Sequence, residues 1–297
     1  MNQIYIAPTY RCNNRCLMCG VFNTKKDSYK EYSLEEVIHK MDEHNIVKGD
    51  IVVISGGEPT IYRYFFDILE YLEAKKARII IFSNGRLFKD NNFVNRMKDY
   101  NYENMLIPLF GSTSEIHDGF TSVQGSFKDT YQGLCNLDNK GLRYSIKTVV
   151  MKGNYKDLPV WAKFISETFH NIFRISIHGL HLQGEAGKIA KQLYVSHKEG
   201  APYIEQALEI LERKEIDIAI SAFPLCVLDP VYWKYNITSN LAEYTALSDD
   251  SEKIRETNIK NYRDRPLVCD KCRIQAKCEW PWRMYEKLFS LDYLHQI

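Results

Sequence analysis

The sequence predicts an α/β fold in which parallel strands alternate with helices along most of the chain. Short apolar segments recur, and each is followed by a stretch whose apolar residues have helical spacing. Turns that contain glycine or asparagine often separate the two kinds of segment. Apolar strands between helices are typical of a sheet that is covered on its faces, either closed into a barrel or left open. Both arrangements bind ligands at the carboxyl ends of their strands.

Seven segments have the composition of strands, because β-branched and other apolar residues dominate them. In chain order the expected strands are Gln3–Pro8, Ile51–Ile54, Ala77–Phe82, Met105–Phe110, Leu142–Met151, Ile172–Ile177 and Ile216–Ser221. The regular alternation with helices fades after the sixth of them.

Helix signals lie between these strands. Ser33-Leu34-Glu35-Glu36 has the pattern of a capping box, in which Ser and Glu side chains bind free N–H groups at a helix start. Gly141 follows the helix that we expect over Ser126–Asn139, and glycine is common just past a helix end. The remaining helices are expected near Val37–Met41, Phe65–Leu72, Phe93–Met97, Leu158–Phe169 and Tyr203–Leu211.

Composition places the chain among ordinary globular proteins. It has 297 residues and a mass of 34.8 kDa, with 45% hydrophobic and 26% charged residues, which excludes global disorder. The 39 Lys and Arg nearly balance the 38 Asp and Glu, so no charge excess predicts binding to nucleic acid or to an acidic membrane. The N-terminal residues do not resemble a signal peptide, and no apolar run is long enough to span a bilayer. We therefore expect a cytoplasmic protein, in which disulfides are uncommon.

Seven of the eight cysteines fall into two groups. The first group follows the first expected strand and consists of Cys12, Cys16 and Cys19. The second lies in the last quarter of the chain and consists of Cys226, Cys269, Cys272 and Cys278. Cys135 stands alone, and we expect it to be a small buried apolar residue.

The first group places three thiols in one short loop. Thiolates are soft ligands that suit iron–sulfur clusters, zinc and copper(I). A structural zinc site closes its tetrahedron with four ligands, and residues 20–30 contain no further Cys or His. Three thiolates on a four-iron cluster would instead leave one iron open to a substrate or cofactor. The spacing by itself is compatible with a zinc loop as well as a cluster loop.

A second motif, Ser55-Gly56-Gly57-Glu58-Pro59, follows the second expected strand. Glycines let bare backbone approach a ligand closely, although the motif alone is also compatible with an ordinary strand-to-helix turn. The Cys-xxx-Cys-xx-Cys loop after the first strand, together with Gly-Gly-Glu-Pro after the second, resembles the radical S-adenosylmethionine (radical SAM) enzyme superfamily. The resemblance covers roughly the first three-fifths of the chain.

This resemblance implies a partial (β/α)6 barrel, similar to an incomplete TIM barrel, with a 4Fe–4S cluster on Cys12, Cys16 and Cys19. It implies that SAM binds the open iron and is cleaved reductively to a 5′-deoxyadenosyl radical, which abstracts a substrate hydrogen. An external electron donor of the flavodoxin or ferredoxin type would supply the electron.

The resemblance also assigns residues to SAM. The turn that contacts the SAM amine would be Gly56, Gly57, Glu58 and Pro59, and a second contact region would include Ser83 and Asn84. Relatives often carry Ser and Asp where this chain has Pro108 and Phe110, so polar contacts to SAM are in doubt there. The residues His178 and His181 follow the sixth strand, in a region that borders adenine and substrate in relatives. The spacing singles out no catalytic acid or base.

The second cysteine group offers four thiolates, which also suit a four-cysteine zinc site. In a radical SAM chain its Cys-xx-Cys-xxxxx-Cys spacing resembles the auxiliary-cluster domains called SPASM and twitch, and the shorter twitch type holds one further 4Fe–4S cluster. Four protein ligands would close this cluster and suit it for electron transfer. The resemblance therefore implies a barrel over residues 1–200 and a twitch-like domain over residues 201–297.

Three hypotheses for function follow. The C-terminal segment is similar to maturases of His-Xaa-Ser peptide systems, which favours oxidation or cross-linking of a ribosomally made precursor peptide (RiPP maturation). The expected barrel starts near residue 3, so a separate leader-peptide recognition protein, or recognition by the barrel itself, would be needed. The alternative is a dehydrogenase or epimerase acting on a small molecule such as a sugar or cyclitol. The third is a non-enzymatic zinc or electron-transfer protein.

Overall fold

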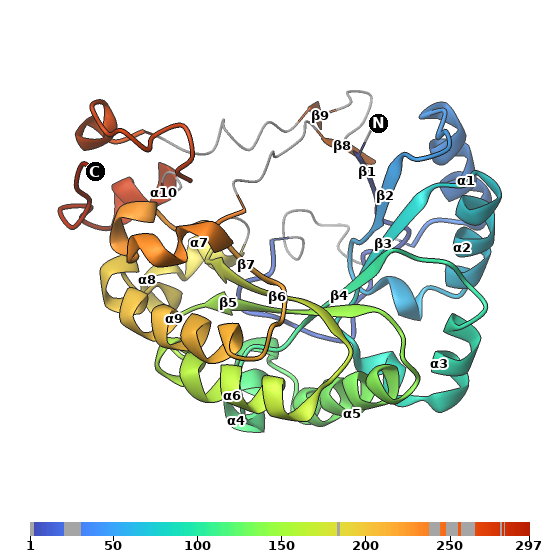
Figure 1. Cartoon of the computed structure of the whole chain (residues 1–297). Coiled ribbons are helices and arrows are strands. Elements are labelled where there is room, and N and C mark those ends of the chain that lie inside the picture. Colours follow the sequence, from blue (N-terminus) through green and yellow to red (C-terminus); the bar gives the residue numbers. More distant parts are fainter. Residues whose placement is uncertain are drawn as a thin grey trace.

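The computed structural model describes residues 3–20, 31–182, 185–237, 244–247, 255–256, 265–279, 281 and 283–297. Its centre is a sheet with the strand order β7-β6-β5-β4-β3-β2-β1-β8-β9. Strands β1 to β7 follow one another across the sheet in chain order, and all are parallel. Within the described residues β7 and β9 form the two edges, so the sheet is curved but not closed (Figure 1). The prediction of an α/β partial barrel is confirmed.

The parallel strands lie close to their predicted positions. They are β1 (Gln3–Ile6), β2 (Ile51–Ile54), β3 (Arg78–Phe82), β4 (Asn104–Pro108), β5 (Tyr144–Val150), β6 (Ile172–Gly179) and β7 (Ile218–Ser221). Two further strands, β8 (Tyr244–Leu247) and β9 (Arg255–Glu256), extend the sheet beyond β1. Strand β8 is parallel to β1, and β9 is antiparallel to β8.

Helices cover the outer side of the curved sheet, as Figure 1 shows for α1, α2, α3, α5, α6 and α9. The helices are α1 (Leu34–Glu43), α2 (Phe65–Ala74), α3 (Asn91–Met97), α4 (Ser114–Thr121), α5 (Ser126–Asn139), α6 (Leu158–Thr168), α7 (Glu185–Lys188), α8 (Ala190–Leu193), α9 (His197–Glu212) and α10 (Arg283–Leu288). The predicted capping box begins α1, because Ser33 Oγ accepts from Glu36 N and Glu36 Oε2 accepts from Ser33 N.

The main core lies between the sheet and these helices. Residues of β2 and β3 that point outward, such as Ile54 and Ile81, are fully buried against helix residues such as Leu69. Burying an aliphatic side chain of this size stabilises the fold by about 1.5–3 kcal/mol. Packing between the sheet and the helices therefore fixes the shape of the sheet. The inner face of the sheet, which these helices do not cover, can line a cavity.

Some elements differ from the prediction. Helix α4 was not predicted, because its sequence Ser-Glu-Ile-His-Asp-Gly-Phe-Thr has little apolar periodicity; Thr113 caps it through a bond from Ile116 N. Residue 200 falls inside α9, and β7 joins the barrel sheet. The division into domains 1–200 and 201–297 stays a prediction.

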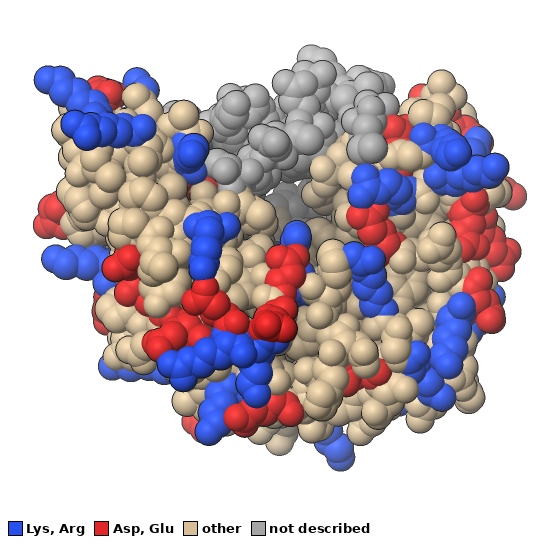
Figure 2. All heavy atoms as spheres, in the orientation of Figure 1, with Lys and Arg blue, Asp and Glu red and all other residues tan. Residues whose placement is uncertain are grey.

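The visible surface carries mixed charges. Figure 2 shows Lys and Arg interspersed with Asp and Glu over the helices, as the near balance of charge suggests. Within the described part of the chain, no helix combines the length and apolar character that crossing a bilayer requires.

Candidate functional site

A cavity of about 370 Å³ lies at the carboxyl ends of the parallel strands. Its wall combines the loop after β1, the turns after β2 and β3, and the ends of β4, β5 and β6. Eight of the predicted site residues line this cavity: Cys12, Cys16, Cys19, Gly56, Gly57, Glu58, Ser83 and Asn84. Parallel topology brings them together, because every strand of such a sheet ends at the same edge.

The middle of the first cysteine loop is held by backbone hydrogen bonds to the end of α4. Arg15 N donates to Thr121 O at 2.8 Å, and Leu17 N donates to Phe120 O at 2.9 Å, which fixes the middle of the loop against the end of α4. Within the loop, Asn14 N donates to Cys12 Sγ at 3.4 Å. The unpredicted helix α4 therefore has a clear structural role in placing the thiols.

Burial strongly affects the thiols of this loop. Burial, with a smaller contribution from the neighbouring thiols, raises the pKa of Cys12 to about 11 and that of Cys16 to about 12. The raised pKa favours the neutral form of Cys12 and Cys16 unless a cation stabilises the thiolates. The donor set therefore fits a soft, positively charged metal group.

The Gly-Gly turn after β2 packs directly against the chain segment that precedes Cys12. Gly57 N donates to Thr9 O at 2.9 Å, and Glu58 N donates to Arg11 O at 2.8 Å. A Cβ atom on Gly57 would lie 2.1 Å from Arg11 O, and Gly56 has a φ of +100°, which favours glycine. The close approach of the backbone therefore requires glycine at both positions, whether or not a ligand binds there.

Replacing Gly57 with alanine should displace the cysteine loop. The added Cβ meets backbone rather than a flexible side chain, so we expect a loss of about 1–3 kcal/mol in the free energy of unfolding. Iron retention after anaerobic reconstitution should also fall. Gly119→Ala is the control, because nothing lies within 4 Å of a Cβ at this helical position. Equal stability and iron content in the two variants would contradict the role given to Gly57.

Glu58 is a buried carboxylate that joins the turns after β2 and β3. It is 1% exposed and accepts from Thr60 N at 3.1 Å, Thr60 Oγ1 at 2.6 Å, Ser83 Oγ at 2.8 Å and Asn84 N at 2.6 Å. Burial raises the pKa of Glu58, and these hydrogen bonds oppose the rise. Pro59 is buried at the start of the short helix η1 (Pro59–Ile61) and does not line the cavity.

Asn84 connects the third strand to the cysteine loop. Its Nδ2 donates to Asn13 Oδ1 at 2.6 Å and lies 3.9 Å from Cys12 Sγ. Ser83 and Asn84 therefore support Glu58 and the cysteine loop, in addition to lining the cavity.

The opposite wall of the cavity is largely apolar but contains a cation that the sequence analysis missed. Pro108 and Phe110 line it, and so does Lys147 on β5. Burial lowers the pKa of Lys147, and within the described residues no carboxylate pairs with it. An anionic ligand beside Lys147 would favour its charged form and oppose this lowering of the pKa.

His178 lies on the neighbouring strand β6. Its Nδ1 is 2.7 Å from Ser221 Oγ on β7, and burial, followed by the charges of Lys147 and His181, lowers its pKa well below the ordinary value. The imidazole is therefore neutral near physiological pH. His181 also lines the cavity, as predicted for the end of this strand.

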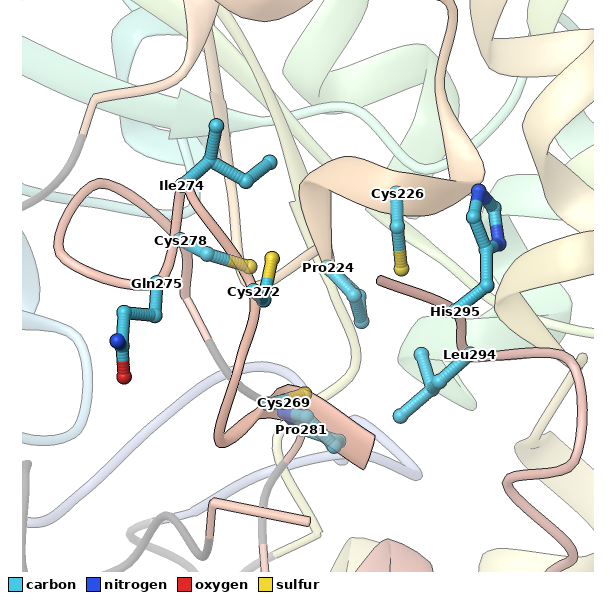
Figure 3. A pocket seen from close by; sticks show the side chains of 10 residues that line it. All are labelled: Pro224, Cys226, Cys269, Cys272, Ile274, Gln275, Cys278, Pro281, Leu294 and His295. Carbon is cyan, nitrogen blue, oxygen red and sulfur yellow. The ribbon is translucent and has the colours of Figure 1, made fainter. Parts of the chain in front are cut away.

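The second cysteine group surrounds a separate pocket. Cys226 comes from the short helix η4 (Leu225–Val227), and the other three come from the segment that begins at η7 (Leu267–Cys269). In Figure 3 the side chains of Cys226, Cys269, Cys272 and Cys278 point toward a common space, beside His295. The fold thus brings together thiols that lie far apart in the sequence.

Backbone groups bind two of these sulfurs. Leu225 N donates to Cys278 Sγ at 3.3 Å, and the backbone N–H of His295 donates to Cys226. Burial raises the pKa of Cys278 to about 12 and also raises the pKa of Cys226 and Cys269. The carboxylate of Glu279 is buried and accepts from Ala222 N, which ties this loop to the residue after β7.

The spacing of the thiols bears on which metal group fits. Within the described residues, no three His, Cys, Asp or Glu side chains converge tightly enough for a single metal ion. A zinc ion lies about 2.3 Å from each of its sulfurs, whereas the irons of a cluster spread their ligands around a larger body.

Cys135 lies apart on α5, half-buried against the main core.

The fold and the cavity define an α/β partial barrel with a thiol loop and a glycine turn facing one cavity at its carboxyl edge. A family model described as the Radical SAM superfamily matches residues 6–165. This match covers more than half of the chain, and the protein belongs to the radical SAM superfamily.

The individual relatives share less than 30% sequence identity with the chain. The chain is 26% identical over 184 residues to the Fe-coproporphyrin III synthase of Methanosarcina barkeri, covering 62% of this chain and 45% of that protein. It is 28% identical over 155 residues to the mycofactocin maturase MftC of Mycolicibacterium smegmatis, covering 52% and 39% respectively. It therefore spans less than half the length of these relatives. The crystal structure of Streptococcus suis SuiB bound to S-adenosylmethionine has the same fold, with a TM-score of 0.67, 16% identity and coverage of 99% of this chain and 76% of SuiB.

Proposed function

We propose that the chain is a radical SAM enzyme whose first cluster is held by Cys12, Cys16 and Cys19. The observation that carries the proposal is the convergence of these thiols with the Gly-Gly-Glu turn on one cavity. When bound, this cluster and SAM would supply a 5′-deoxyadenosyl radical for hydrogen abstraction, and a second cluster would accept the electron that an oxidation releases.

The residues around the cavity would bind and orient SAM. The backbone of Gly56 and Gly57 offers close approach, and Ser83 and Asn84 complete the same wall. Lys147, on the opposite wall, offers its charge to the SAM carboxylate, which Pro108 and Phe110 are unsuited to bind.

Replacing Lys147 with methionine should weaken SAM binding by about tenfold or more, because a hydrogen bond to a charged group contributes about 1.5–3 kcal/mol. Titration of the cluster-loaded chain with SAM measures this change. Lys147→Arg should recover part of the affinity. Lys152→Met is the control, since Lys152 is exposed in the turn after β5. Wild-type affinity in Lys147→Met would remove this residue from SAM binding.

We further propose that Cys226, Cys269, Cys272 and Cys278 hold an auxiliary 4Fe–4S cluster in a twitch-like C-terminal domain. Their arrangement around one pocket, with backbone N–H groups directed at two sulfurs, supports this assignment. N–H···S bonds are a usual means of tuning cluster potentials.

For the substrate, we propose a ribosomally made peptide that is oxidised or cross-linked. The similarity to a mycofactocin maturase and the shared fold with SuiB, which is also described bound to its precursor peptide SuiA, support this proposal. The partners would be an external electron donor and a separate leader-peptide recognition protein. The similarity to the Fe-coproporphyrin III synthase supports the alternative of a small-molecule substrate.

Co-expression distinguishes these alternatives. A short open reading frame beside the gene would be expressed with the enzyme, with and without intact Cys12, and the peptide mass would be measured. The peptide proposal predicts loss of hydrogens only with the intact enzyme. The proposal would be refuted if the peptide mass stayed unchanged while the enzyme converted a small molecule whose biosynthetic enzymes are encoded in the same gene neighbourhood.

A further inference from the structure

Arg86 contacts the cysteine loop from the neighbouring turn. It begins the short helix η2 (Arg86–Lys89), just after the turn that follows β3. Its Nη1 donates to Asn13 O at 2.5 Å and to Asn14 Oδ1 at 3.0 Å. Both acceptors lie between Cys12 and Cys16, and Asn14 N itself donates to Cys12 Sγ. The guanidinium thus contacts the residue next to Cys12 and a residue two positions from Cys16.

Asp129 on α5 holds the other side of the same guanidinium. Its Oδ2 accepts from Arg86 Nε at 3.3 Å and from Nη2 at 3.0 Å, while Oδ1 accepts from Lys89 Nζ at 2.8 Å. The Arg86 and Asp129 side chains are only 15% and 18% exposed, whereas Lys89 is 51% exposed. Burial alone would raise the pKa of Asp129, but the bonds from Lys89 and Arg86 lower it below the ordinary value, so the carboxylate is charged.

The backbone adds a further connection. Arg86 N donates to Asn84 Oδ1 at 3.0 Å, and Asn84 Nδ2 donates to Asn13 Oδ1. The planar guanidinium of Arg86, on η2, therefore joins helix α5 to the cysteine loop, because it donates to Asp129 and to the loop at the same time. Arginine can do this, but lysine, with its single ammonium, cannot reproduce the geometry.

We propose that Arg86 and Asp129 form a clamp that positions the Cys12–Cys19 loop and sets the charge beside the group that the loop binds. This inference rests on the proposed function, because it takes that group to be the SAM-binding cluster. Arg86 and Asp129 are positioning residues, since neither supplies a thiol. Residues that hold a metal ligand in place typically change metal affinity or activity by about 10–100-fold when replaced.

The clamp predicts opposite electrostatic effects for its two members. Reduction adds an electron to the cluster, so a nearby positive charge favours the reduced form. Arg86→Met removes a positive charge and should make the midpoint potential more negative. Asp129→Asn removes a negative charge while keeping an acceptor oxygen, and should make it less negative. A general loosening of the loop would move both variants in the same direction.

The test uses the full-length, anaerobically reconstituted chain, with an EPR-monitored redox titration and iron analysis. The relevant signal is the one that SAM changes, which separates this cluster from the C-terminal one. We expect about tenfold weaker retention of the SAM-responsive cluster during gel filtration with a chelator in Arg86→Met. We also expect opposite potential shifts in Arg86→Met and Asp129→Asn, and a near wild-type potential with reduced retention in Arg86→Lys.

Lys89→Met is the matched control. It removes a positive charge from the same carboxylate but does not touch the loop, so cluster retention should equal that of the wild type. Far-UV circular dichroism and the C-terminal cluster signal report on folding of every variant. Wild-type retention in Arg86→Met, or potential shifts of one sign in both clamp variants, would overturn the clamp alone. A wild-type chain without a SAM-responsive cluster would overturn the proposed function and the clamp with it.

Discussion

Replacement of Cys12, Cys16 and Cys19 with alanine should abolish formation of 5′-deoxyadenosine from SAM. The three thiols are the ligands that the cavity offers to a SAM-binding cluster, and no other Cys lines it within the described residues. Bound iron should fall from about eight to about four atoms per chain, because each 4Fe–4S cluster carries four. Anaerobic incubation with a reductant, followed by chromatography of the nucleoside products, measures the loss.

Cys135→Ala serves as the control for this variant. Cys135 is half-buried on α5 and lines neither cysteine pocket, so iron content and 5′-deoxyadenosine formation should both be unchanged. Far-UV circular dichroism would show whether the triple variant keeps its fold, as we expect from partly exposed thiols outside the main core. Continued 5′-deoxyadenosine formation in a folded triple variant would exclude these cysteines from the chemistry.

The second large effect concerns the C-terminal pocket. Replacing Cys269 and Cys278 with alanine should again halve the bound iron, but formation of 5′-deoxyadenosine should persist. The reason is that the two cysteine groups line different pockets, and the C-terminal thiols are absent from the wall of the large cavity. Substrate oxidation should be lost, because its electron no longer has an acceptor.

Metal analysis of the same samples checks the alternative. If the wild-type chain binds about four irons and one equivalent of zinc, and the zinc disappears in Cys269→Ala/Cys278→Ala, the C-terminal site is structural zinc. If the Cys269→Ala/Cys278→Ala variant still binds about eight irons, the second cluster lies elsewhere.

The strands and most helices were predictable because their signals are local. Ile51–Ile54 is apolar throughout and forms β2 with the same bounds, and the Ser33 capping box fixes the start of α1. Helix α4 escaped prediction because its stability depends on Thr113 and on contacts such as Phe120 with the rest of the barrel. Strand β8 is added by pairing with β1, and no local pattern in the sequence indicates that partner.

The site was predictable where its residues form motifs and not where they act through position. The thiols and the Gly-Gly-Glu turn are recognisable because their spacing is unusual. Lys147 resembles a surface residue of a strand, and only the inward direction of alternate β5 residues places it in the cavity. Arg86 is likewise a single charged residue after a turn, and its contacts with Asn13 and Asp129 depend on the folded arrangement.

The central claim is that SAM binds to a cluster on the first cysteine loop. The most direct measurement is the EPR spectrum of the reduced, cluster-loaded chain before and after addition of SAM. We predict that SAM changes one of two cluster signals, and that this signal is missing from the variant without Cys12, Cys16 and Cys19. A spectrum that SAM leaves unchanged, in a wild-type chain with both clusters loaded, would contradict the account.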